Sequence, residues 1–150
     1  METRLIVCGG VDFNDYSFFK SQMDRLIAYY ENIRLVSGHA RGADTFAEQY
    51  AAETGIPIQV FPAEWKKYGK AAGPIRNHAM LDYAKEENPV VAAFWDGQSR
   101  GTGNMLKQAK AAEVECHIFL YVRQEEHDHE LSECNNQRNN NFYSGILPEG

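Results

Sequence analysis

The chain alternates short apolar runs with segments whose apolar residues recur at helical spacing. Helical periodicity predicts helices over about 15–31, 43–51 and 75–83, and composition predicts a fourth helix over 103–113. The apolar runs are typical of buried strands, and they are Arg4–Cys8, Ile33–Val36, Ile56–Phe61, Val90–Trp95 and Cys116–Val122. Continuous apolar strands that alternate with helices predict a Rossmann-like α/β fold, a parallel sheet of about five strands with helices on both faces.

Three residues predict where helices begin or end, and a fourth predicts the position of a strand in the sheet. Asn14 is suited to the N-cap of the first helix, because a short polar side chain can accept a hydrogen bond from a free amide. Gly55 is expected to end the second helix, as C-cap glycines do. Pro74 fits the first turn of the third helix, and Pro57 predicts an edge position for its strand.

Composition divides the chain into two parts. Residues 1–122 carry 15 acidic and 13 basic side chains, whereas residues 123–150 carry 6 and 2. The second part is mostly polar from Gln124 to Asn141 and becomes apolar again from Phe142 to Pro148. We therefore expect a folded domain over 1–122 and a polar, acidic appendage over 123–150, whose end either docks on the domain or on a neighbouring subunit or stays loose.

Overall composition limits the class of protein. The 150 residues and the formal charge of −6 describe one ordinary globular domain. No apolar run reaches the length of about 18 residues that a membrane span needs, and the N-terminus lacks a secretory pattern. Three widely spaced cysteines favour a reducing cytoplasm. The acidic balance argues against binding to nucleic acid, which needs clustered positive charge.

Glycine gathers where this fold binds ligands, beyond the carboxyl ends of the strands. The first such segment, Ser37–Asp44, joins a strand to a helix, so its backbone amides around Gly38 and Gly42 suit a phosphate. The Ser37 hydroxyl and the Arg41 guanidinium would add donors. The alternative is a tight turn with Arg41 on the surface and Asp44 as an ordinary acid of the first helical turn.

A second segment, Trp95–Asn104, has the same strand-to-helix character. Gly101 and Thr102 at the helix start suit a phosphate, and Asp96 at the strand end suits ribose hydroxyls. The alternative is a flexible loop in which Thr102 caps the helix.

A third segment, 61–77, combines aromatic and basic residues. Trp65 and Tyr68 are available to stack on a base, beside the lysines at 66, 67 and 70. Arg76 and Asn77 enter a helix start that would face the other two loops. The alternative is a solvated lysine run over a tryptophan of the core.

These segments carry a family resemblance. Ser37-Gly38-His39-Ala40-Arg41-Gly42-Ala43-Asp44 resembles the S-G-x-A-R-G-x-D motif of the DNA-processing family DprA/Smf. The blocks at 61–65, 68–77, 80–81 and 99–102 resemble the YspA-like branch of the SLOG superfamily, which also contains the LOG phosphoribohydrolases. The resemblance spans residue 4 to about 120. It implies a Rossmann-like domain that binds nucleotides or nucleotide-derived ligands, and it implies self-association as a dimer or larger homo-oligomer.

The sequence also departs from these families. Met105 stands where LOG enzymes carry a catalytic glutamate, and a thioether is neither an acid nor a base. Asn77 replaces the lysine of the LOG M-x-x-R-K motif, although Arg76 keeps its arginine. Val11 stands where the YspA-like branch often has an arginine. His39 occupies a position that is commonly small or apolar, where it would contact a phosphate or base or cap the loop.

Three functions follow from these observations. The first is binding of a mononucleotide, NAD or an ADP-ribose derivative, for sensing or sequestration. The second is hydrolysis of an N-glycosidic bond, with Asp44 or Asp96 replacing the missing glutamate. The third, single-strand DNA binding, is disfavoured by the net charge. The predicted ligand-binding residues are Gly9, Gly10, Ser37, Gly38, His39, Arg41, Gly42, Arg76, Asn77, Asp96, Ser99, Arg100, Gly101 and Thr102, with Trp65 and Tyr68 for the base.

No metal or other cofactor is expected. His127, His129 and Cys134 have a His-x-His spacing that a transition metal could use, but three ligands in the polar appendage are weak evidence for a metal site.

Overall fold

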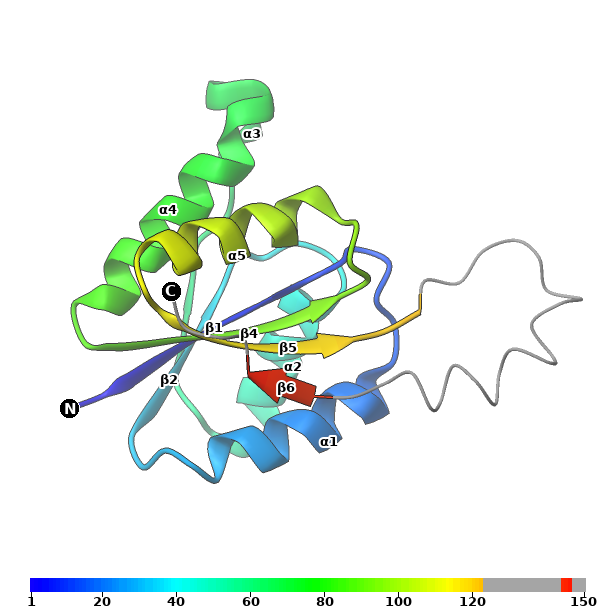
Figure 1. Cartoon of the computed structure of the whole chain (residues 1–150), viewed down its shortest axis with the longest axis vertical. Helices are drawn as coiled ribbons and strands as arrows, with labels where there is room; N and C mark the ends of the chain where they lie inside the picture. Colours follow the sequence, from blue (N-terminus) through cyan, green and yellow to red (C-terminus); the bar gives the residue numbers. More distant parts are fainter. Residues whose placement is uncertain (123–143, 147–150) are drawn as a thin grey trace, which may run out of the picture.

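A six-stranded sheet with helices on both faces forms the protein (Figure 1). The computed structural model describes residues 1–122 and the backbone of residues 144–146. The strands are β1 (Thr3–Gly9), β2 (Ile33–Ser37), β3 (Ile58–Val60), β4 (Asn88–Trp95), β5 (Glu115–Leu120) and β6 (Ser144–Ile146). The helices are α1 (Tyr16–Ile27), α2 (Ala43–Thr54), α3 (Trp65–Tyr68), α4 (Ala72–Lys85) and α5 (Arg100–Ala111), with a 3-10 turn, η1 (Gly69–Ala71), between α3 and α4.

The strand order confirms the predicted Rossmann-like fold. The sheet runs β3-β2-β1-β4-β5-β6, and its first five strands are parallel to one another. β3 lies at one edge, as Pro57 predicted. The sixth strand was not predicted: β6 pairs antiparallel with β5, with Gly145 opposite Ile118. This order places the carboxyl ends of β2, β1 and β4 side by side.

Alternation along the strands builds two cores. Successive side chains of a strand point to opposite faces, so Leu5 and Val7 pack with α1 and α2 while Ile6 and Cys8 pack with α4 and α5. Figure 1 shows the same division, with α4 and α5 on one side of the sheet and α1 and α2 on the other. Cys116 lies in the second core with Cys8, and both thiols are buried.

The expected ends of the helices are partly right. Gly55 ends α2 in a left-handed conformation, with φ 79° and its amide bonded to the carbonyl of Ala51. Pro74 lies in the first turn of α4. The N-cap of α1 is Asp15 and not Asn14, because the Asp15 carboxylate accepts the amide of Phe18 at 3.0 Å. Asn14 and Asp15 are both suitable N-cap residues, so the sequence alone does not distinguish them.

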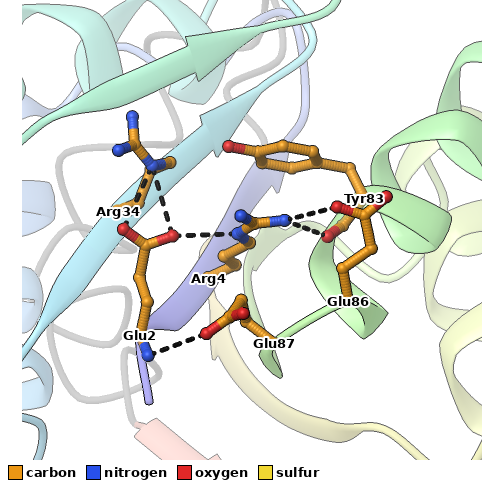
Figure 2. A network of polar contacts seen from close by, with 6 residues as sticks. All are labelled: Glu2, Arg4, Arg34, Tyr83, Glu86 and Glu87. Carbon is orange, nitrogen blue, oxygen red and sulfur yellow. Dashed lines mark hydrogen bonds and ion pairs between the residues drawn. The ribbon is translucent and has the colours of Figure 1, made fainter.

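A polar network at the amino ends of the strands fixes the far end of α4 (Figure 2). Arg4 donates to the carbonyl of Tyr83 at 2.7 Å and to Glu86 at 3.0 Å, and its guanidinium lies 3.9 Å from the centroid of the Tyr83 ring. Glu2 bridges Arg4 and Arg34, so β1 and β2 share the network. These contacts hold the carboxyl end of α4 against the sheet.

Little of the predicted appendage lies within the described residues. The division into 1–122 and 123–150 stays a prediction, and His127, His129 and Cys134 are outside the described part. In residues 1–122 no group of three or more histidine, cysteine, aspartate or glutamate side chains is arranged to hold a metal ion. None of the described helices is long and apolar enough to cross a bilayer.

Candidate functional site at the carboxyl edge

Three loops meet at the carboxyl ends of β1, β2 and β4, and their backbones touch. A side chain at Gly9 would place its Cβ 2.5 Å from the carbonyl oxygen of Phe94 and 2.7 Å from the Cβ of Ala43. A side chain at Gly42 would strike the carbonyl of Gly10. Gly9 and Gly10 therefore form the floor between α2 and the loop after β4, where only glycine allows the approach.

The loop after β2 is organised around Asp44. This side chain is 4% exposed, and its carboxylate accepts the amide of Ala40 at 3.3 Å and interacts with the amide of Gly38. The Ser37 hydroxyl donates to the Asp44 carbonyl at 3.1 Å and accepts the amide of His39 at 3.2 Å. Several of the amides expected to hold a phosphate thus have acceptors inside the loop.

Burial gives Asp44 an unusual acidity. Desolvation raises the pKa of its carboxyl to about 6, although the loop amides and the nearby Arg76 act in the opposite direction. A proton donor or acceptor near neutral pH would suit hydrolysis. The carboxylate, however, faces the loop amides and is closed off from solvent.

Asp44 predicts a measurable pH dependence of stability. The folded state keeps this proton up to about pH 6, whereas an ordinary aspartate loses it near 3.8, so stability should fall as pH rises through that window. Asp44→Asn keeps an amide-accepting oxygen and removes the titration. Denaturant unfolding should show the variant gaining about 2 kcal/mol relative to wild type between pH 4 and pH 7. Parallel pH profiles for the two proteins would contradict this account.

Arg76 and Asn77 connect the loop after β2 to α5. The Arg76 guanidinium donates to the carbonyl of Gly38 at 2.5 Å and to the Asn77 side chain at 3.0 Å. The Asn77 amide donates to the Gly101 carbonyl at 3.2 Å and to the Asn104 side chain at 3.1 Å. Asn77 is 4% exposed, so this connection is part of the folded framework.

The first turn of α5 is an open helix N-terminus. The structure starts this helix at Arg100, three residues before the sequence prediction. Its N-cap residue is Ser99 and not Thr102, and the Ser99 side chain makes no capping bond to the helix. Gly101 is exposed, with no atom within 4 Å of where its side chain would lie. Thr102 in the same turn is buried, and the Gly103 amide donates to the Ser99 carbonyl at 3.0 Å. The exposed part of the turn, at Arg100 and Gly101, suits an anion, which the helix dipole favours.

Asp96 supports the loop before α5. Its Oδ1 accepts the amides of Gln98 and Ser99 at 2.8 Å and the Ser99 hydroxyl at 2.9 Å. Burial alone would raise the pKa of this carboxyl, but these hydrogen bonds outweigh it and keep the pKa below its ordinary value. Its Oδ2 is buried without a hydrogen-bond partner in the described part of the chain. Oδ1 is therefore occupied by the loop, and Oδ2 is closed off from solvent.

Three other residues that the sequence analysis assigned to the ligand have separate surroundings. His39 has a positive φ of 62°, and its Nδ1 lies 2.7 Å from Glu48 on α2. Arg41 is exposed. Trp65 is 58% exposed, so the alternative of a core tryptophan is wrong. The third segment instead folds into α3 and η1, which the sequence did not predict.

Two groups at this edge were missed. The Tyr121 hydroxyl donates to Asp12 at 2.7 Å, and both lie where a side chain on Gly10 would be. Asn104 accepts the Asn77 amide. Tyr121 directly follows β5, so its position at the end of a strand was the signal that could have identified it.

The strand order defines the class of the protein as a Rossmann-like α/β domain. Within this domain, residues 3–68 match the model of the YspA, cpYpsA-related SLOG family. The match confirms the family resemblance over these residues. Met105, which the resemblance places at the position of the LOG glutamate, lies on α5 and is fully buried in the core.

One curated relative is similar over part of its length. The "Gene 61 protein" of Mycobacterium phage D29 is 33% identical over 85 residues, which cover 53% of this chain and 66% of the phage protein. The similar region therefore spans just under two thirds of that relative.

Proposed function

We propose that this domain binds a nucleotide or a nucleotide-derived small molecule, with a phosphate on the first turn of α5. The observation that carries the proposal is the open turn at Gly101, joined through Asn77 to the cation of Arg76. Amides at a helix N-terminus and an arginine fork are complementary to phosphate oxygens. Arg100, exposed in the same turn, adds a second positive charge.

The match of residues 3–68 to the SLOG family model supports the nucleotide character of this ligand. A mononucleotide, NAD or an ADP-ribose derivative each carries a phosphate for this turn. Binding would serve to sense or sequester the ligand, and it needs no further cofactor. Self-association into a dimer or larger homo-oligomer stays a prediction from the family resemblance.

Binding is favoured over hydrolysis by the direction of the two candidate carboxylates. Asp44 and Asp96 both accept loop amides, and Met105 supplies no acid or base. Hydrolysis of an N-glycosidic bond needs a carboxylate at the sugar. Asp44 would have to leave its loop before it could act there.

Arg76→Ala tests this proposal. We expect the variant to bind AMP, NAD or ADP-ribose about 10- to 100-fold more weakly in titration calorimetry, because a charge-assisted contact to phosphate is lost. Arg25→Ala removes an exposed charge from α1, on the opposite face of the sheet, and serves as the control. Unchanged affinity in a folded Arg76→Ala variant would contradict the proposed phosphate site.

A further inference from the structure

A hollow of about 330 Å³ lies between the end of β3, α3 and α4, and Arg76 is among its lining residues. Aromatic and apolar side chains line much of it, among them Phe61, Tyr68 and Ile75. Tyr68 is 39% exposed and Ile75 is 43% exposed, so this apolar surface is open to solvent. Charged groups lie at the same hollow: Glu64, Lys67 and Arg76.

Arg76 belongs to both places. Its side chain lines the hollow, and its guanidinium also donates to Gly38 and to Asn77, which contacts the first turn of α5. The hollow and the first turn of α5 are therefore connected through Arg76 and Asn77. A ligand whose anionic part lies on α5 can extend its other end past Arg76 into the hollow.

We propose that the hollow holds the base of a nucleoside monophosphate, an inference that rests on the proposed phosphate site. Every nucleobase has a flat face that can stack on an aromatic side chain, and Tyr68 and Phe61 offer such rings at the hollow. Lys67 lies 5.0 Å from the centroid of the Tyr68 ring, and this cation–π contact steadies the ring at the hollow.

The size of the hollow selects among the candidate ligands. About 330 Å³ is at the small end of ligand pockets, which range over roughly 300–1,000 Å³. It accommodates one nucleoside, so the second half of NAD would remain outside it. The geometry therefore favours a mononucleotide over the dinucleotide ligands that the family allows.

The structure also separates the two aromatic residues that the sequence grouped together. Tyr68 lines the hollow, whereas the exposed Trp65 does not. The Trp65 ring lies 3.5 Å from where a Cβ on Gly73 would be. We assign base stacking to Tyr68 and Phe61 and not to Trp65.

Filling the hollow tests this inference. Ala79 lines it from an exposed position on α4, so Ala79→Trp should occupy the space without entering the core. His78→Trp adds a similar ring at the neighbouring exposed position, which does not line the hollow, and is the matched control. Titration calorimetry with AMP, NAD and ribose 5-phosphate would be performed on wild type and both variants.

For wild type we expect AMP to bind about tenfold more tightly than ribose 5-phosphate, and NAD no more tightly than AMP. Ala79→Trp should remove the advantage of AMP and leave ribose 5-phosphate binding unchanged, whereas His78→Trp should keep both. If wild type binds ribose 5-phosphate and binds AMP no more tightly, or if Ala79→Trp leaves AMP affinity intact, the base site is wrong and the phosphate site stands. If none of the three compounds binds wild type, the proposed function is wrong, and the base site with it.

Discussion

Replacing Gly42 by alanine should destabilise the domain by about 3–5 kcal/mol, because two costs combine there. Gly42 has φ 82° and ψ −129°, a conformation that side chains disfavour, and its Cβ would strike the carbonyl of Gly10. Relief of that clash would push α2 away from the loop after β1. Denaturant unfolding of the variant measures the cost directly.

Gly55 offers a control for this substitution. It also has a positive φ, 79°, but its ψ of 6° lies in the left-handed helical region that other residues can adopt, and no neighbouring atom lies within 4 Å of where a side chain would be. Gly55→Ala should therefore cost only about 1 kcal/mol, the penalty of the left-handed conformation alone. Equal losses at the two positions would show that α2 and the β1 loop do not depend on close backbone contact.

Gly101→Asp should reduce AMP affinity by about 100-fold or more while leaving the domain folded. The new carboxylate would lie at the amides proposed for the phosphate, and two like charges a few ångströms apart repel by roughly 4 kcal/mol near a protein surface. Space for the side chain is already present. An acidic residue also suits the first turn of a helix, so stability should rise by about 0.5–1 kcal/mol.

The control for this variant is Gly101→Ala, which adds a side chain without charge. It should unfold at a denaturant concentration no lower than wild type and keep its affinity for AMP within a few-fold. Titration calorimetry and denaturant unfolding of the three proteins separate charge from bulk. Strong AMP binding by Gly101→Asp would place the phosphate elsewhere.

The architecture was predictable because its signals are local and repeated. Runs such as Val90–Trp95 are apolar at every position, as expected for strands of a sheet that is covered on both faces. The helices between these strands follow from the helical spacing of their apolar residues. The β6 strand was not predictable, because its three residues acquire their structure by pairing with β5. α3 was not predicted either, because its four residues are too few to show a helical apolar period.

The loops of the site were found from the sequence, but the roles of their groups were not. An aspartate in the first turn of a helix usually faces solvent, and only the folded loop shows that Asp44 turns inward to the amides of Gly38 and Ala40. The contact of Arg76 with Gly38 joins residues 38 positions apart. Hydrogen bonds between distant segments cannot be obtained from motif spacing.

Mass spectrometry after incubation with a mixture of nucleotides tests the central claim most directly. Wild type and Gly101→Asp would each be incubated with AMP, IMP, NAD, ADP-ribose and cyclic ADP-ribose. Compounds released by denaturing the protein would be measured separately from those in the free solution. We expect wild type to retain one compound intact, with no new product in solution, and Gly101→Asp to retain none. Retention of no compound by wild type, or accumulation of free base or ribose phosphate in its solution, would contradict the account.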